Sequence, residues 1–495
     1  SIIYKEINMA GFNLVRNAKV LFTTNVNAAT KVVTEGTLTA AKTQELQVMN
    51  GFSFSQNTET QSITVSEAGL DPARGQRTFN TALAPVDFSF TTYIRPKLSG
   101  SVTAEEKVLW NALLSDTEID ATGVTLTTVS GIVRTGTTNA AAFTFAASNL
   151  STLKVGEVIT FSGIVDTANP TNWNAAAKIV SATPAAAADG SLSATTTVLN
   201  VEYLQAPLGT GNPTGLGTVK VFKGAVTSQS GYLLAHSGRS NKNQLTAFGI
   251  VVSIDSTTYV IDNCSLNQAS VEFGLDGIAQ VAWTGQGTKL RQLAAATLTA
   301  GTATGGVAGS YTAADTTANF ITNKLTTATL FSNLRGISGT EYSIAITGGN
   351  LTINNNISYV TPEILGTVNA PIGYFTGTRA ISGNVTAYLK TGLSGDGKAQ
   401  TGGLLTDMLA ASSTATETKY SLGLAIGGKS NAIRVEIDLP GIMLQVPSIE
   451  TSDVVSTTIN FTAEGFTSAT SASAGGIAAY DLEATNDLTL RYYSA

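Results

Sequence analysis

The same succession of strands and a helix occurs twice in this chain, and this repeat constrains the fold more than any single motif. A strand ending in tyrosine is present in each copy, Phe88–Tyr93 in the first and Gly383–Tyr388 in the second. A short helix follows, with apolar residues at the same i, i+1, i+4, i+5 spacing in both copies: Val108, Leu109, Ala112 and Leu113, then Leu404, Leu405, Met408 and Leu409. A duplicated unit without an evident catalytic site indicates symmetric assembly.

Two further segments align between the copies. Gly51–Phe54 corresponds to Asn350–Ile353, and each opens a strand that leads into a polar loop. The strand pair Leu266–Trp283 corresponds to Leu444–Phe461 at one constant shift, which places Glu272 and Glu450 at equivalent positions. Repeated carboxylates at one position are typical of shared surface geometry or of a repeated salt bridge between subunits, because an acid–base pair needs two unlike environments.

The composition is that of a folded protein with few charges. Of the 495 residues, 43% are hydrophobic and only 13% are charged, so the surface is built mainly from small and polar residues. A net charge of −6 argues against a protein that grips nucleic-acid phosphates, which requires a basic face. Ser1–Glu6 lacks a basic region followed by an apolar core, and no apolar run is long enough to span a membrane, so we expect neither a signal peptide nor a membrane helix.

Strand signals dominate the chain. Runs of β-branched or aromatic residues bounded by Gly, Asn and Asp predict strands at 62–65, 248–252, 281–283 and 433–437. Along Phe88–Tyr93, apolar and hydroxyl side chains alternate, which predicts one buried and one polar face. Two helices are predicted, at Ala104–Leu114 and Gly402–Ala411, with Glu105 and Glu106 in the opening turn of the first.

The first copy carries an insertion of about 120 residues after its helix, which is the size of a domain. Its content predicts a small all-β domain, with strands separated by Gly- and Ala-rich turns. The predicted strands lie at 124–129, 157–161, 197–201 and 218–222. A second change in composition, at Ala294–Asn319, is nearly all Ala, Thr and Gly and suits a flexible connection between the copies.

One segment matches a phosphate-binding motif. Gly423–Ser430 reads G-x-x-x-x-G-K-S, in which backbone amides, lysine and serine would hold a nucleotide and its Mg²⁺. That motif must open a helix, whereas the alternating run 433–437 that follows predicts a strand. We therefore interpret the segment as a turn. Gly209–Gly215 resembles a dinucleotide loop but has the wrong spacing and contains a proline, so it is also interpreted as a turn.

The residues that would support catalysis are sparse. His236 is the only histidine and is predicted to lie in a solvated loop, and Cys264, the only cysteine, is predicted to be a small buried residue. One histidine and one cysteine exclude the usual zinc sites. The remaining acidic residues are scattered, among them Asp276 and Asp453, and we predict no enzyme activity, no cofactor and no metal.

A loop between the first two long strands is a candidate contact surface. It carries Glu67, Asp71, Arg74 and Arg77, which could form ion pairs with a neighbouring chain. The alternative is a solvated hairpin tip, and spacing alone does not separate the two.

Several segments resemble the tail tube (major tail) proteins of T5-type siphophages. They occur in the order found in that family and cover both copies but not the insertion: 63–69, 74–80, 110–113, 268–272, 283–285, 346–349, 352–356, 371–373, 375–377, 386–388 and 447–451. The resemblance implies a mainly β fold with one short helix per repeat, made of two fused tail-tube β-sandwich or barrel domains, to which the inserted small all-β domain is added. It also turns the contact role of Glu67, Asp71, Arg74 and Arg77 into an expectation.

On this basis the expected domains are a first tail-tube domain at 1–117 with 241–293, an inserted all-β decoration domain at 118–240, a linker at 294–322, a second tail-tube domain at 323–480 and a C-terminal tail at 481–495. The resemblance implies that three chains form a pseudo-sixfold ring, that rings stack into a hollow tail assembled in the host cytoplasm, and that each helix covers the outside of the barrel. The implied partners are further copies of the chain, the tape measure protein and later genomic DNA in the lumen without specific binding, and the tail terminator and distal tail proteins, with no membrane.

Two alternatives remain open. The first is a tube protein of a contractile-tail phage or of a related secretion or injection system, which would share the fold. The second is a surface adhesin with sugar-binding modules, which would suit the Thr-rich β composition but predicts a signal peptide and exposed aromatic pockets, and neither is visible in the sequence.

Overall fold

The computed structural model describes most of the chain between residues 18 and 493. The segments outside the description are 35–37, 50, 66–74, 100, 115–122, 135–139, 154, 156–157, 166–172, 174–175, 188–190, 204–211, 214, 223–230, 237–244, 255–256, 294–295, 300–301, 306–309, 315–318, 334–340, 367, 396, 413–418, 429–432, 448, 451–454 and 464–487, together with both ends.

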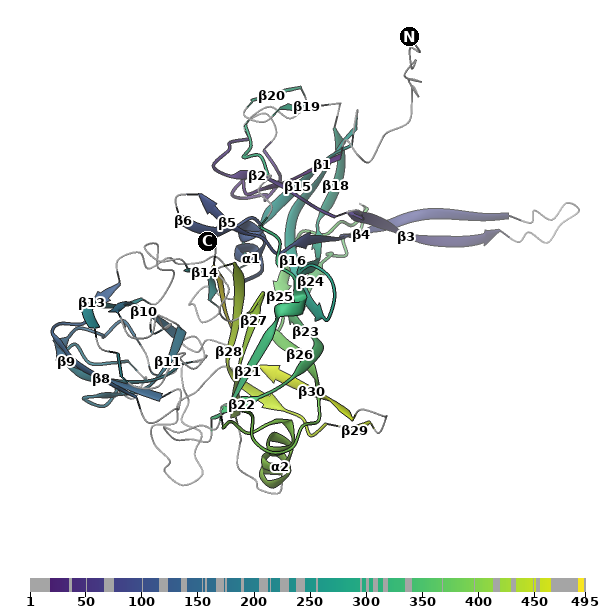
Figure 1. Ribbon diagram of the computed structural model, residues 1–495. Coiled ribbons are helices and arrows are strands. Elements are labelled where there is room, and N and C mark those ends of the chain that lie inside the picture. Colours follow the sequence, from purple (N-terminus) through teal and green to yellow (C-terminus); the bar gives the residue numbers. More distant parts are fainter. Residues whose placement is uncertain are drawn as a thin grey trace, which may run out of the picture.

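The predicted mainly β fold is confirmed. The described residues form one 18-stranded sheet, one seven-stranded sheet and three two-stranded sheets, with the α-helices α1 (Lys107–Leu114) and α2 (Thr401–Ser412). Figure 1 shows the large sheet running through the length of the molecule and the seven-stranded sheet beside it. A single core connects both copies of the repeat, which matches the alternation of apolar residues in the sequence.

The first copy is a sheet of eight strands folded into two layers, and one long strand, β16, belongs to both layers. The strands are paired in the order β2-β1-β15-β16 in the outer layer and β16-β17-β4-β3 in the inner layer, with β18 continuing β17 alongside β16. Their bounds are β1 (Ala18–Thr23), β2 (Thr43–Leu46), β3 (Ser53–Val65), β4 (Gly75–Tyr93), β15 (Phe248–Ile254), β16 (Thr257–Gly274), β17 (Gln280–Gly287) and β18 (Lys289–Leu293).

The second copy has the same topology. Its outer layer is paired in the order β22-β21-β27-β28 and its inner layer in the order β28-β30-β26-β23. The bounds are β21 (Thr327–Asn333), β22 (Glu341–Ser343), β23 (Ile346–Asn354), β26 (Ala380–Tyr388), β27 (Lys419–Ile426), β28 (Arg434–Leu444), β29 (Ile449–Glu450) and β30 (Ser456–Ala463). The repeat expected from the sequence is therefore a repeat of strand order and of pairing.

The inner layers of the two copies form one continuous sheet. β16 pairs antiparallel with β23 from Gln268 opposite Asn354 to Gly274 opposite Gly348. The inner sheet thus runs β3-β4-β17-β16-β23-β26-β30 and ends at β28 and β29, with both copies contributing.

In two strands, the residues that are equivalent by strand pairing differ by two positions from those that the alignment of the two sequence copies makes equivalent. Taking Tyr93 and Tyr388 as equivalent, the pairing of β3 with β4 places Ser53, rather than Gly51, at the position of Asn350. The pairings of β17 and β30 likewise place Gly285, rather than Trp283, at the position of Phe461. The second difference arises because Glu450 and its strand partner Ser456 are two residues closer in sequence than Glu272 and its strand partner Gln280, which a constant shift does not take into account.

The insertion contains a sheet with its own core. Seven strands are paired in the order β7-β13-β10-β11-β12-β9-β8, with Phe143, Phe161, Trp173 and Tyr203 buried between them. Their bounds are β7 (Val124–Thr125), β8 (Val129–Arg134), β9 (Ala140–Ser148), β10 (Val158–Val165), β11 (Ala176–Thr183), β12 (Thr196–Tyr203) and β13 (Gly215–Phe222).

Two strands outside the repeat extend the outer layer of the second copy. β31 (Thr489–Tyr493) pairs with β28, and β14 (Gly231–His236) pairs with β31. β31 lies in the range that was expected to be a tail, and β14 lies in the range assigned to the insertion but does not join the seven-stranded sheet. Neither partner is adjacent in sequence, so local pattern could not indicate the pairing.

Short elements complete the described chain. They are β5 (Pro96–Ser99) with β6 (Ser101–Ala104), β19 (Ala296–Thr299) with β20 (Thr302–Gly305), β24 (Ile357–Val360) with β25 (Gly373–Thr376), and a 3₁₀ turn at Asn323–Leu325. The segment expected to be a flexible connection thus contains a hairpin. In addition, Tyr311 is buried in a small cluster with Leu21 and Val251.

Candidate functional site

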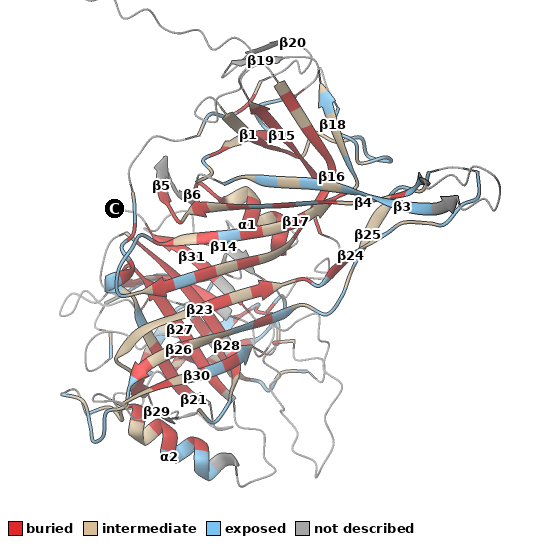
Figure 2. Cartoon of the chain, turned by 90° about the vertical axis from the view of Figure 1, so that its right-hand side faces the viewer, coloured by how far each residue is buried: buried red, intermediate tan, exposed pale blue. Residues whose placement is uncertain are grey.

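The inner sheet has one buried face and one polar face. Along each strand, residues that pack into the core alternate with small polar residues, and Figure 2 shows the resulting stripes of buried and less buried segments. Phe88 and Phe90 are buried, whereas Ser89 is exposed, as the sequence predicts. The polar face comprises Asp87, Ser89, Thr91, Gln268, Ser270, Glu272, Gln280, Ala282, Thr284, Asn350, Thr352, Asn354, Ser382, Asn384, Thr386, Thr458, Asn460 and Thr462.

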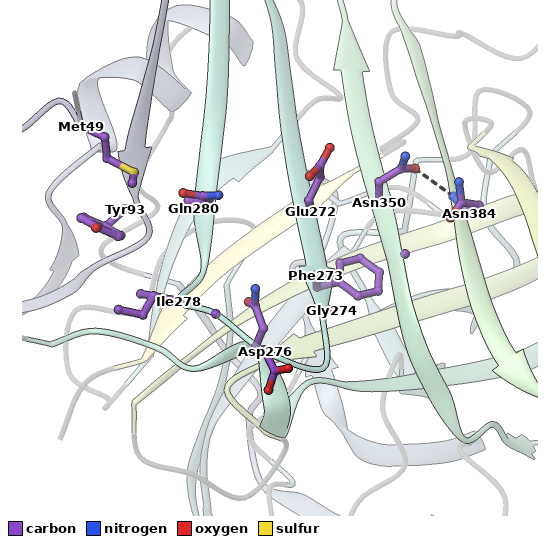
Figure 3. A pocket seen from close by; sticks show the side chains of 13 residues that line it. Met49, Tyr93, Glu272, Phe273, Gly274, Asp276, Ile278, Gln280, Asn350 and Asn384 are labelled. Carbon is purple, nitrogen blue, oxygen red and sulfur yellow. Dashed lines mark hydrogen bonds between the residues drawn. The ribbon is translucent and has the colours of Figure 1, made fainter. Parts of the chain in front are cut away.

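The polar residues form continuous rows across the strands. One row contains Tyr93, Gln280, Glu272, Asn350, Asn384 and Asn460, each directly opposite the next on the neighbouring strand. The members of the row from Tyr93 to Asn384 line an open depression of about 720 Å³ (Figure 3), in which the backbone N–H of Asn384 donates a hydrogen bond to Asn350 Oδ1 at 3.2 Å. Asp276 and Ile278, in the turn between β16 and β17, border the depression.

The charge on this face is negative. Asp87 and Glu272 are its charged members, and none of its members is a lysine or an arginine. Asp87 Oδ1 accepts a hydrogen bond of 2.8 Å from Gln286 Nε2 across the sheet. Carboxylates repel phosphates and the amides and hydroxyls are neutral, so this face offers no ionic attraction to a nucleic acid.

Both ends of the inner sheet are open within one chain. Among the described strands, β3 pairs only with β4 and β29 only with β30. The internal equivalents of these two edges, β23 and the second half of β16, are paired with each other. Open strand edges are templates for pairing with another chain.

The long hairpin of β3 and β4 projects away from the sheet (Figure 1). Its described side chains beyond the base are exposed on both faces, including Phe79, which is 53% exposed. Asn369 of the second copy contacts the base of the hairpin, where the N–H of Leu83 donates to its carbonyl oxygen at 2.8 Å.

The predicted contact residues lie at the far part of this hairpin. Arg77 is exposed on β4, opposite Ile63. Glu67, Asp71 and Arg74 lie outside the described residues, so their contact role stays a prediction. The open edges of the inner sheet were not predicted from the sequence, although the repeat implies them. Where two repeated units pair through one strand of each, the equivalent strands at the outer ends of the two units have no partner within the chain.

The segment that matches the phosphate-binding motif opens no helix among its described residues. Gly423–Ile426 form the end of β27 rather than a turn, and the strand predicted after the motif is confirmed as β28, which begins at Arg434. β27 ends at Ile426, opposite Val435 on β28, and Gly427 and Gly428 adopt left-handed backbone angles with φ of +97° and +98°. Lys429 and Ser430 lie outside the described residues, as does most of Gly209–Gly215.

The remaining candidate residues have structural surroundings. Cys264 is buried, and burial raises the pKa of its thiol well above its ordinary value, as expected of a small core residue. The prediction for His236 was wrong, because it is the last residue of β14, opposite Thr489, rather than part of a loop. Glu272 and Glu450 occupy the equivalent positions predicted for them, Glu272 near the end of β16 and Glu450 at the end of β29. Asp276 is exposed, and Asp453 lies outside the described residues.

The described residues contain neither a metal-binding cluster nor a membrane-spanning helix. No group of three or more histidine, cysteine, aspartate or glutamate residues in that part of the chain could hold a metal ion. No helix there is long and apolar enough to cross a membrane.

The chain is similar in sequence to a phage protein. It is 25% identical over 427 residues to the tail tube protein pb6 of Escherichia phage T5, an alignment that covers 85% of this chain and 68% of the phage protein. No protein-family model matches the chain. The alignment extends over both copies of the repeat, and the resemblance to T5-type tail tube proteins that the sequence predicts is therefore confirmed.

Proposed function

We propose that this chain is a structural subunit of a phage tail tube, without enzyme activity, and that three chains close into a ring through the two open edges of the inner sheet. The similarity to a phage tail tube protein supports the structural role. The observation that carries the ring is the pairing of β16 with β23, because it is an internal example of the contact that the open edges can make with a neighbouring chain.

The repeat gives the register of this contact. Glu272 lies opposite Asn350, and the equivalents of these residues are Glu450 and Ser53. Val271 lies opposite Leu351, and the corresponding pair is Ile449 and Phe54. β29 of one chain therefore pairs with β3 of the next, antiparallel, with Glu450 opposite Ser53. A ring of such contacts leaves no open edge in the inner sheet.

In such a ring the polar face lines the lumen. The core face of each inner strand is covered by the outer layer of its own copy, which leaves the polar face as the free side of the sheet. A lumen with carboxylates, amides and hydroxyls and without basic residues lets the tape measure protein and later DNA pass without specific binding. The exposed hairpin of β3 and β4 would contact a neighbouring chain or ring.

Disulfide trapping tests the ring. Residues directly opposite each other in an antiparallel pair have Cα atoms about 4.5–5.5 Å apart, which a disulfide can span. The variant S53C/E450C should form a ladder of covalent species on a non-reducing gel that ends at the trimer. Each single variant and the out-of-register variant S53C/V446C should give no ladder. Native Cys264 is buried and contributes little background. Absence of the ladder, or a ladder that continues past the trimer, would contradict the proposal.

A further inference from the structure

The two equivalent helices differ in how far they are covered. No described residue of α1 is exposed, whereas four of the α2 residues with described burial are: Thr406, Asp407, Leu409 and Ala410. By the apolar spacing of the repeat, Leu409 corresponds to Leu113. Leu113 is fully buried and Leu409 is 54% exposed. The outer face of α2 therefore has an apolar residue at a position that is part of the core in the other copy.

The cover over α1 is supplied by the two strands that extend the outer layer of the second copy. β31 and β14 extend the outer layer of the second copy beyond β28, and β14 lies next to α1. Tyr492 on β31 accepts a hydrogen bond of 2.9 Å from Trp110 Nε1 of the helix, and both side chains are buried. The outer layer of one copy thus covers the helix of the adjacent copy.

In the first copy the place of β31 is taken by β18. β18 pairs with the first half of β16, as β31 pairs with the first half of β28, and Val260 opposite Arg291 corresponds to Asp438 opposite Thr489. By this register Gln292 corresponds to Leu490. Leu490 is 1% exposed in the core, whereas Gln292 is exposed.

The helix and the strand that lack cover lie far apart in one chain. Figures 1 and 2 show α2 at one end of the molecule and β18 at the other. A single chain therefore cannot bring them together, but a second copy can, because their equivalents touch inside the chain. Their charges are complementary: exposed Lys289 lies on β18, and Asp407 is the charged residue of α2.

We infer that the exposed face of α2 is a docking surface for β18 of a second copy of this chain, so that each ring contact consists of the inner strand pair and of this outer layer. The inference rests on the proposed ring. The interface is heterologous, because two different surfaces of the chain meet. Such contacts form a closed ring only when the rotation from each chain to the next adds up to a full turn.

Cysteine accessibility tests the docking separately from ring closure. Leu409→Cys and Gln292→Cys should react readily with a maleimide in the monomer and lose most of that labelling in assembled rings. Val133→Cys is the control, because Val133 is 55% exposed on the inserted sheet. A short bis-maleimide should link L409C chains to Q292C chains only when both are mixed and assembled.

The outcomes are distinguishable. In one outcome, the S53C/E450C ladder forms while the cysteine of Leu409→Cys in assembled rings still reacts with the maleimide as fast as that of Val133→Cys. That result would contradict the docking inference and would support the proposed ring. Protection without a link between the mixed chains would show that another surface covers α2, and would also overturn it. If no ladder forms and the chain stays monomeric, both the ring and the docking are refuted.

Discussion

Phe88 on β4 lies directly opposite Gly285 on β17, and its ring fills the space that a side chain at position 285 would need. The equivalent pair of the second copy is reversed, since Gly383 on β26 lies opposite Phe461 on β30, whose ring fills the space beside the glycine. Each copy therefore keeps one aromatic ring and one glycine at this place in the inner sheet, on exchanged strands. Because the total volume is conserved, both copies can keep the same backbone register.

Gly285→Ala should destabilise the fold by about 1–3 kcal/mol, because the new Cβ would overlap the Phe88 ring and lie 2.5 Å from the carbonyl oxygen of Ser265. Denaturant unfolding measures the change. Gly274→Ala is the matched control on the same sheet, since a Cβ there meets nothing within 4 Å. Adding Phe88→Leu to Gly285→Ala removes the aromatic ring and should restore only part of the lost stability, because the clash of the new Cβ with the Ser265 carbonyl oxygen remains. An unchanged unfolding midpoint for Gly285→Ala would refute the packing argument.

Glu106 should make stability depend on pH. Burial raises its pKa to about 7 from the ordinary 4.5, although the hydrogen bond from the Tyr492 hydroxyl acts in the opposite direction. The native state therefore keeps this proton at pH values where the unfolded chain has lost it. Its contribution to stability is present below pH 4.5 and is lost as the pH rises towards 7.

Glu106→Gln should remove this dependence. The difference in unfolding free energy between pH 5 and pH 8 should shrink by about 2–3 kcal/mol relative to the unmodified chain. Glu59→Gln, at an exposed position on the hairpin, is the control and should leave the difference unchanged. Equal pH profiles for Glu106→Gln and the unmodified chain would show that the carboxyl is not held protonated.

Arg491 joins three parts of the chain. It lies on β31, is 2% exposed, and has its Nη1 3.7 Å from Glu436 Oε2 on β28. Its Nη2 donates a hydrogen bond of 3.0 Å to Thr160 Oγ1 on the inserted sheet. Arg491→Ala should cost about 3 kcal/mol, because a buried carboxylate loses a cation, although Arg434 still pairs with Glu436.

The control for this prediction is Thr160→Val, which removes one hydrogen bond and should cost about 1 kcal/mol. Hydrogen exchange should report faster opening of β31 in Arg491→Ala than in Thr160→Val. Equal protection of β31 in the two variants would show that the charge pair does not hold this strand.

The extent to which the sequence predicted the fold differs between elements. Strands such as β4 were predictable because Phe88 and Phe90 alternate with polar residues, which is a local signal. Both helices were predicted, but α1 begins at Lys107, after the two glutamates placed in its first turn. Glu106 is instead buried against Tyr492, a partner almost 400 residues away in sequence. No local pattern contains that contact.

The candidate site was predicted only in part. The polar face follows from alternation and was expected. The open edges and the cover over α1 depend on which strands pair, and β14 and β31 gave no sign of their partners. The two-residue difference at Gly285 has the same origin, since a shorter connection between two strands changes the register without changing the pattern of either strand.

The polar face predicts how the tube interacts with DNA. Asn384→Lys places a positive charge in the row that contains Glu272 and Asn350, and three such charges would line each ring. Assembled tubes of this variant should retain duplex DNA fragments at low salt and release them as salt rises, because phosphate contacts are ionic. Val133→Lys, with the same charge on the exposed inserted sheet, should retain less DNA, and unmodified tubes should retain little. Retention by unmodified tubes, or equal retention by the two lysine variants, would contradict the assignment of this face to the lumen.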